Sequence, residues 1–365
     1  MNNLEVIILT KGSLKEAVAE NKFWGDSYEP PFSLNKAKWM LENTRADNED
    51  VFAVLGYEKH TIIAFVSLMP DFIKKGKGNL KKIFWSQRWW IANNYMNTVL
   101  PTYIKSNSLT EAKNQIIVRF LGDDTKAYYE KQPFTLFSER MRYVIVFNLD
   151  HKILISKKSG LKKVKTLLRF LDKTSKKITF LINSYKSKKR TKKISYRFIS
   201  NINNKDWAFI ENFCVTDIVP KTQKYIDWQI SNNQYHVITE GEVRPKYKCL
   251  LESVSNKIHN LSFMVEKEGE TIGFISGLVK GGRFVLRYFL ANQDDFNHCI
   301  DALMANLIKS ECTLLQTENT VLAERLKNRY LIVYADSKKL LSLVHNDLDM
   351  NFQDTILNDG DGNFL

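Results

Sequence analysis

Short apolar runs alternate along the chain with segments whose apolar residues recur at helical spacing. In the first half, the runs at 51–55 and 61–67 are rich in β-branched and aromatic residues and flank the polar turn Glu58-Lys-His, which predicts a β-hairpin. Further strands are expected at 6–9, 83–91, 116–121 and 142–147, and helices at 14–24, 33–43, 92–107 and 123–131.

Three local signals refine this order. Ser33 is a favourable N-cap for the second helix. Pro101 is expected to kink the third helix or to end it early, because proline lacks an N–H and clashes with the preceding turn. The segment 71–82 is rich in glycine and lysine and is expected to form a loop.

The second half repeats this order of elements. Thr61-Ile-Ile-Ala-Phe-Val-Ser resembles Thr271-Ile-Gly-Phe-Ile-Ser, so Phe65 aligns with Phe274 at an offset of 209 residues. The shared order on both sides of this match favours a duplicated domain. The expected strands are 196–200, 261–265, 271–276, 283–290, 312–315 and 330–334, and the expected helices are 206–214, 221–231, 294–310 and 320–327.

The positive charge of the chain is concentrated in one segment. The 365 residues include 54 Lys/Arg and 40 Asp/Glu, a net charge of +14. Residues 152–197 hold 17 Lys/Arg and one acidic residue, Asp172, whereas the rest of the chain has a net charge of −2. The length suggests two domains, and 44% hydrophobic residues with few Gly and Pro exclude a disordered or fibrous chain. We therefore expect an N-terminal domain at 1–150, a basic amphipathic helical linker at 151–195 and a second domain at 196–365.

The order strand, two helices, hairpin, long strand, helix, strand, helix, strand resembles the GNAT acyltransferase fold, and it occurs twice. In the first half, Lys126-Ala-Tyr-Tyr-Glu-Lys-Gln-Pro-Phe is similar to the late motif of that family. Tyr129 and Phe134 match the motif tyrosine and phenylalanine, and Pro133 stands where the family usually has glycine. The resemblance implies an α/β (α+β) fold of two GNAT-like domains, each a mixed central sheet flanked by helices, joined by the basic linker.

The phosphate-binding turn of that family is missing from both halves. GNAT enzymes place Arg/Gln-x-x-Gly-x-Gly/Ala at a helix N-terminus, where backbone N–H groups hold the pyrophosphate of the cofactor. Neither 90–97 nor 290–297 contains glycine, and Asp294 and Asp295 would repel a pyrophosphate. The second half is therefore expected to be degenerate. The first half is the better candidate for acetyl-CoA or another acyl-CoA, with these expected cofactor-binding residues: Trp90, Ile91, Asn93 and Asn94.

Tyr129 is the candidate catalytic residue. The resemblance implies a general acid for the departing CoA thiolate, and the alternative is a helix tyrosine that packs on Phe134. Ser86 and Arg88 lie in the central strand, where they either line the cleft or occupy its polar face. No general base is assigned, because the carboxylates near the expected acceptor side are each more typical of solvated surface groups. These are Glu29, Glu49 and Asp50.

Other chemistries find little support in the sequence. The six His show no ligand spacing, so no metal site is expected, and Asp359-Gly-Asp-Gly-Asn is interpreted as a turn and tail. The four Cys form no C-x-x-C pair, which is typical of reduced, mostly buried thiols. No apolar run approaches the roughly 18–20 residues of a transmembrane helix, and the N-terminus lacks the features of a secretory signal. A cytoplasmic protein is expected, with peripheral attachment to the inner membrane face as an open alternative.

The basic insert 152–197 admits three interpretations. Its apolar residues recur at helical spacing beside Lys and Arg, which fits an interfacial helix on anionic lipid or on an acidic partner. The second interpretation is a solvated connector whose apolar stripe packs between the two domains. Nucleic acid is less favoured, because 186–193 has no aromatic residue to stack on bases. The apolar positions are Leu161, Val164, Leu168, Leu171, Ile178, Leu181, Ile182 and Tyr185.

These observations favour an acyltransferase that moves an acyl group from acyl-CoA to an amine or hydroxyl acceptor. The resemblance suggests an acceptor in cell-envelope polysaccharide metabolism. One alternative is an aminoacyl-tRNA-dependent transferase of doubled-GNAT type. Another is a non-catalytic degenerate pair of GNAT domains that acts as a binding or scaffold module.

Overall fold

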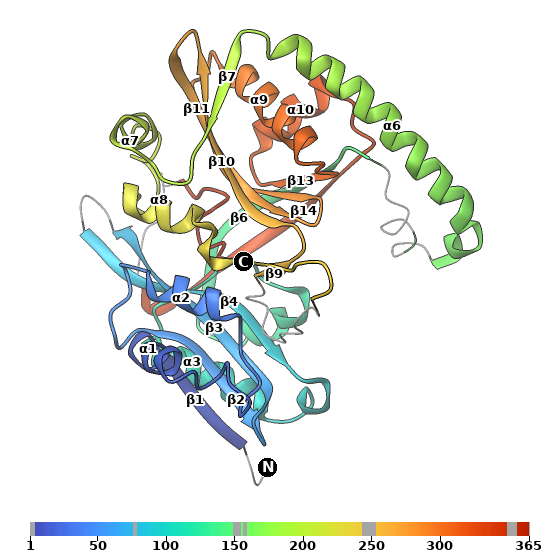
Figure 1. Ribbon diagram of the computed structural model, residues 1–365. Helices are drawn as coiled ribbons and strands as arrows, with labels where there is room; N and C mark the ends of the chain where they lie inside the picture. Colours follow the sequence, from blue (N-terminus) through green and yellow to red (C-terminus); the bar gives the residue numbers. More distant parts are fainter. Residues whose placement is uncertain are drawn as a thin grey trace. The chain divides into compact units, whose positions relative to one another are not determined.

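The computed structural model describes residues 4–75, 79–148, 155, 159–242, 253–348 and 356–364. Cys249, which was expected to be a buried thiol, and residues 152–154 and 156–158 of the basic insert lie outside the described residues. The chain forms two compact units from interleaved segments (Figure 1). Unit 1 consists of 1–140, 211–258 and 340–365, and unit 2 consists of 141–210 and 259–339.

Unit 1 is built on a mixed sheet. Its strands follow the order β1-β2-β3-β4-β5-β14, in which β4 and β5 are parallel and the other described pairs are antiparallel. The strands are β1 (Leu4–Thr10), β2 (Val51–Glu58), β3 (Thr61–Lys75), β4 (Asn79–Ile91), β5 (Ile116–Val118) and the last part of β14 (Tyr334–His345).

Helices cover both faces of this sheet, toward which successive strand residues point alternately. On one face, α3 (Leu100–Glu111) packs through Leu100 and Ile104 on residues such as Val66 and Phe84. On the other face, a second core holds the indole of Trp85. This face is covered by α1 (Lys11–Ala19), α2 (Leu34–Leu41) and α8 (Gln223–Ile230).

Unit 2 has the same plan. Its strands follow the order β6-β13-β12-β11-β10-β7, with β12 and β13 parallel. The helix α9 (Phe296–Lys309) packs on this sheet through Ile300, Leu303 and Leu307. The other elements are β6 (Phe134–Val146), β7 (Ile194–Phe198), β10 (Ile258–Lys267), β11 (Glu270–Lys280), β12 (Arg283–Ala291), β13 (Leu314–Thr317), α6 (Lys165–Arg190), α7 (Asn204–Glu211) and α10 (Thr320–Arg329).

Each half of the sequence contributes its last strand to the sheet that is built mainly from the other half. The end of β6 pairs with β13, with Val146 opposite Leu314. The end of β14 pairs with β5, with Leu343 opposite Val118. The predicted boundaries at 150 and 195 stay a prediction about successive parts of the sequence. The compact units are a different division, because each is made of interleaved segments.

The predicted repeat has a counterpart in strand register. Phe65 pairs with Trp90 in unit 1, and Phe274 pairs with Leu290 in unit 2. The register then shifts directly after Ser67 in the first case and after Ser276 in the second, which are again 209 residues apart. Such bulges are specific local features, so their recurrence at matched positions supports a duplicated unit.

The loop expected at 71–82 was wrong. Among the described residues of this segment, β3 and β4 stay paired from Asp71 opposite Ile83 to Lys75 opposite Asn79. The cause is tertiary, because the Asp71 carboxylate is buried and accepts hydrogen bonds from side chains of other elements. Sequence composition does not reveal such an anchor.

Two element boundaries also differ from the prediction. The helix expected at 92–107 begins at Leu100, and Pro101 lies in its first turn, where a missing N–H costs nothing. The strand expected at 330–334 was wrong, because β14 begins at Tyr334. Tyr330 instead ends α10 and donates from its hydroxyl to Asp301 Oδ1 at 2.8 Å.

Residues 360–362 and Phe364 near the C-terminus are buried in unit 1, so the interpretation of this segment as a turn is correct but its interpretation as a tail was wrong. Asp361 is fully buried and forms an ion pair with Lys221. The Arg119 guanidinium donates to the carbonyl of Asp361 at 2.6 Å. Gly362 has a φ of 63°, and a Cβ there would meet the Trp85 ring at 2.6 Å, so only glycine suits this close approach.

Candidate active site

Strands β4 and β5 separate at a defined point in unit 1. They pair from Phe84 opposite Ile116 to Ser86 opposite Val118, after which β5 ends while β4 continues to Ile91. At the same point β4 carries one extra residue relative to β3, because the partners change from Leu68–Ser86 to Ser67–Arg88. A bulge redirects side chains and interrupts pairing. We call this point the fork.

Three polar side chains meet at the fork on the face covered by α3. Lys105 of α3 donates from Nζ to the Ser86 hydroxyl at 3.1 Å, and this ammonium group lies 5.5 Å from the centre of the Tyr129 ring. Tyr129 ends the short helix α4 (Lys126–Tyr129) and also interacts with Ser86. Lys105 is fully buried, and Ser86 and Tyr129 are more than nine-tenths buried. We call these three residues the fork cluster.

Burial changes the acidity of the fork cluster. The pKa of Lys105 falls to about 7, because burial disfavours the ammonium form. Among the described residues, no carboxylate forms an ion pair with Lys105 that would offset this effect. Burial also raises the pKa of Tyr129 well above its usual value, although the hydrogen bond with Ser86 acts in the opposite direction. At neutral pH the tyrosine therefore keeps its proton, while the lysine exchanges one readily.

A hydrogen-bond donor without a partner lies close to the fork cluster. Trp89 follows the bulge in β4, and its ring contacts Tyr128 edge to face at 5.0 Å between centroids. The Trp89 Nε1 atom is buried and has no hydrogen-bond partner among the described residues. Buried N–H groups are rarely left unpaired in proteins, so this atom is a candidate contact for a ligand.

The predicted site residues are only partly brought together. Tyr129 belongs to the fork cluster, and Ile91 is buried in the same apolar core. Trp90 points to the opposite face of the sheet, where it stacks on Phe65 at 5.7 Å. Asn93 and Asn94 are exposed in a single 3-10 turn (Asn93–Tyr95) ahead of α3.

Lys105 was missed by the sequence prediction. A signal was present, because Lys105 stands three and four residues before Ser108 and Leu109, and both of these are buried. The sequence could show that a lysine lies on the inner face of a helix, but it could not show that no carboxylate would reach it.

The described residues of unit 2 show no equivalent polar cluster at the matching bulge. The residue before the bulge in β12 is Leu286, where β4 has Ser86. The start of α9 is occupied by Asp295, whose carboxylate accepts from Lys267 Nζ at 2.9 Å and lies 3.0 Å from His298 Nδ1. An anionic side chain therefore stands at this helix start, held by its own neighbours.

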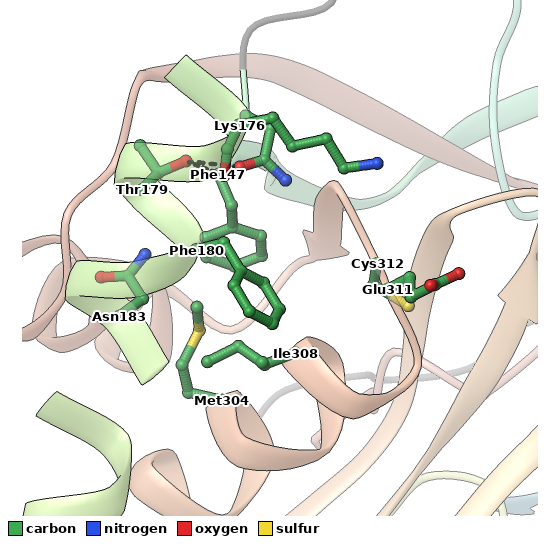
Figure 2. Close-up of a pocket in the computed structure, with 10 residues that line it drawn as sticks. Phe147, Lys176, Thr179, Phe180, Asn183, Met304, Ile308, Glu311 and Cys312 are labelled. Carbon is green, nitrogen blue, oxygen red and sulfur yellow. Dashed lines mark hydrogen bonds between the residues drawn. The ribbon is translucent and has the colours of Figure 1, made fainter. Parts of the chain in front are cut away.

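A small pocket of about 100 Å³ lies between α6 and α9 in unit 2. Figure 2 shows Phe180 and Met304 among the side chains around it. Three of its polar residues have hydrogen-bond partners, because the Thr179 hydroxyl donates to Asn148 Oδ1 at 2.5 Å and Asn183 donates to the Leu331 carbonyl at 3.0 Å. The lining also includes Lys176, Glu311 and Cys312.

The described residues contain no group of three or more His, Cys, Asp or Glu placed to hold a metal ion. Within the same ranges, no helix combines the length and the apolar character needed to cross a bilayer.

Comparison with known proteins identifies the fold. No protein-family model matches the chain, and no curated protein matches it. Among solved structures, N-myristoyltransferase from Saccharomyces cerevisiae with bound myristoyl-CoA is 10% identical, covers 94% of this chain and 83% of its own, and gives a TM-score of 0.52. A GCN5-related N-acetyltransferase from Anabaena variabilis is 9% identical, covers 94% and 74%, and gives a TM-score of 0.44.

The likeness to N-myristoyltransferase, a tandem GNAT-fold enzyme, confirms the expected fold. The chain has a mixed α/β architecture with the GNAT fold in duplicate. At this level of identity the likeness concerns the fold alone.

Proposed function

We propose that this protein is an acyltransferase that transfers an acyl group from acyl-CoA to an amine or hydroxyl acceptor, with its reactive centre at the fork of unit 1. The observation that carries the proposal is the fork cluster. A buried lysine, serine and tyrosine meet where the central strands separate, and unit 2 has Leu286 at the matching position. Buried polar groups with shifted pKa values are typical of functional sites.

The residues near the fork fit an acyl-CoA at both of its ends. Trp89 Nε1 offers a buried donor close to Tyr129. In the first turn of α3 the Leu100 N–H donates to Thr98 Oγ1 at 3.2 Å, and the Tyr103 N–H donates to the Val99 carbonyl at 3.0 Å. Pro101 has no N–H, so among the described residues the Thr102 N–H is the backbone donor of this turn that a phosphate could use. Asn93 and Asn94 present neutral amides just before this turn. In unit 2 the corresponding position carries Asp295, which favours unit 1 as the acyl-CoA site.

The fork cluster can supply the proton that acyl transfer requires. When bound, acyl-CoA supplies an activated thioester carbonyl and a thiolate leaving group. Tyr129 holds its proton at neutral pH, so its hydroxyl can act as a general acid. Lys105 can return a proton from Nζ through Ser86 Oγ to the Tyr129 oxygen, because its pKa of about 7 lets it gain and lose a proton near neutrality. The acceptor nitrogen or oxygen loses a proton when it is acylated, and this proton replaces the one that Lys105 gave up.

The first test is calorimetric titration of the full chain with acetyl-CoA and with myristoyl-CoA. We expect binding of at least one of them, and Trp89→Phe should weaken it up to about tenfold by removing one donor. Trp24→Phe is the matched control, because Trp24 Nε1 already donates to the Phe32 carbonyl at 2.7 Å, on the opposite face of the sheet. An absence of binding to either compound at millimolar concentration would contradict the proposal.

The second test concerns Tyr129. With hydroxylamine as a small acceptor, Tyr129→Phe is expected to lower the rate of CoA thiol release about 10²-fold with little change in acyl-CoA affinity. Tyr128→Phe is the control, because this ring contacts that of Tyr129 at 5.3 Å between centroids but, among the described residues, has no contact with Ser86. Binding without any thiol release by the wild type would favour the binding module over the enzyme.

A further inference from the structure

Helix α6 packs on the rest of unit 2 through a polar stripe. Thr179, Asn183 and Ser187 recur every four residues and are buried. Asn183 donates to the Leu331 carbonyl at 3.0 Å and accepts from the Leu331 N–H at 2.9 Å. Thr179 bonds Asn148, and Arg190 donates to the Arg329 carbonyl at 2.6 Å. The polar side of this helix is therefore its buried side, the reverse of an ordinary amphipathic surface helix.

The apolar side of α6 faces outward. Figure 1 shows α6 as the long green helix beside α9. Phe170 is 66% exposed, Ile178 50%, Leu181 66% and Tyr185 72%. With Leu167, these residues recur at intervals of three, four or eight and form one stripe roughly 27 Å long. We call it the α6 stripe. The interpretation of this segment as a connector whose apolar stripe is packed is wrong at five of its predicted positions, which are exposed: Val164, Ile178, Leu181, Ile182 and Tyr185.

Positive charge accompanies the α6 stripe along its length. Helix α6 contains nine Lys/Arg and one acidic residue, Asp172, for a net charge of +8. Lys173 and Lys177 alternate with Phe170 and Leu181 at spacings of three and four residues, so ammonium groups border the apolar side chains. Lys188 and Lys189 continue this pattern at its C-terminal end.

The exposed apolar residues and the bordering lysines of the α6 stripe together favour one class of binding partner, by charge complementarity. A second copy of this chain would bring a helix of the same charge of +8 against the first, which is repulsive. A nucleic acid would use the lysines but would leave the leucine and isoleucine side chains in water. An anionic bilayer surface accepts both, because apolar side chains enter the acyl boundary while lysines remain at the phosphate level.

We propose that α6 is a membrane-docking element that lays the α6 stripe into the surface of a bilayer rich in anionic lipid. The rest of unit 2 packs on the opposite, polar side of the helix. Docking of this kind needs no opening of the fold, because the stripe is already exposed. The inference is independent of the acyltransferase proposal, since it uses no residue of the fork.

The proposal is tested by sedimentation of the full chain with vesicles. Binding to phosphatidylcholine vesicles that contain phosphatidylserine is expected to be at least about tenfold tighter than to phosphatidylcholine alone, and to weaken as salt is raised. A triple variant, Ile178→Ser with Leu181→Ser and Tyr185→Ser, should weaken binding about tenfold or more. A charge variant, Lys173→Glu with Lys177→Glu, should have a similar effect.

Two control variants separate docking from general surface effects. Val215→Ser with Val237→Ser removes exposed apolar groups elsewhere, and Lys15→Glu with Lys205→Glu reverses exposed lysines elsewhere. Both should bind like the wild type, and all variants should keep the thermal midpoint of the wild type. Equal binding to both vesicle types, or unchanged binding of the α6 variants, would overturn the proposal. So would a wild-type dimer that the triple variant converts to a monomer without any vesicle binding.

Discussion

The free energy of unfolding of the wild type is expected to rise between about pH 7 and pH 10.5 by roughly 5 kcal/mol more than that of Lys105→Met. Lys105 has a pKa of about 7 in the folded protein, against 10.5 for an unperturbed lysine, so the unfolded chain binds the additional proton throughout this interval. Stability therefore increases with pH across it. The full penalty is present below pH 7, and none remains above the unfolded pKa. Methionine fills similar space without a titrating group.

Urea unfolding at pH 6, 8 and 9.5 measures this difference. Lys15→Met serves as the control, because Lys15 is exposed on α1 and its replacement should leave the pH dependence of the wild type intact. Lys105→Met should also be more stable than the wild type at pH 6, since it removes a buried ammonium without an ion pair. Parallel pH profiles of the wild type and Lys105→Met would show that Lys105 is not buried as described, and would remove the acid–base argument for the fork cluster.

The second large effect is expected for Asp71→Ala, which should lower the free energy of unfolding by about 3–5 kcal/mol. The Asp71 carboxylate forms a buried ion pair with Arg45 and accepts from Trp85 Nε1 at 2.9 Å and from the Tyr225 hydroxyl at 2.8 Å. The Arg45 guanidinium also lies 3.3 Å from the centre of the Tyr225 ring. Alanine would leave the guanidinium buried without its carboxylate.

Asp47→Ala is the matched control for Asp71. Its carboxylate is 75% exposed and pairs with Lys82, so its loss should cost at most about 1 kcal/mol. The double variant Arg45→Met with Asp71→Leu should recover much of the stability lost in Asp71→Ala, because it removes both charges together. Chemical denaturation at neutral pH measures all three variants. A cost for Asp71→Ala no larger than that for Asp47→Ala would contradict the buried network.

Several local features followed from the sequence because their causes lie within a few residues. Ser33 caps α2 by accepting from the Lys36 N–H at 3.2 Å, as predicted from its residue type. The hairpin turn after Glu58 was placed correctly, and Lys59 and His60 adopt φ values of 47° and 64° there. The repeat of Phe65 and Phe274 reflects strand register, which alternation of side chains specifies strongly.

The candidate site was predictable only in part. Tyr129 could be found because the motif around it is contiguous. The sequence could not assign a role to Lys105, because its lowered pKa depends on its burial and on the lack of a carboxylate partner at the fork. The expected cofactor residues Trp90 and Ile91 are neighbours in sequence, yet they point to opposite faces of β4. Their use in acyl-CoA binding, with that of Asn93 and Asn94, stays a prediction.

The sequence by itself determined the order of strands and helices, the duplication and the amphipathic basic helix, since these rest on local periodicity. The tertiary structure decided which groups became buried together. It paired Asp71 with Arg45 and buried Asp361 in the interior of unit 1. It also paired β6 with β13 and β14 with β5, which belong to opposite halves of the sequence. It also turned the polar side of α6 inward. Such outcomes depend on contacts between residues far apart in the chain, where burial and pairing free energies outweigh local preference.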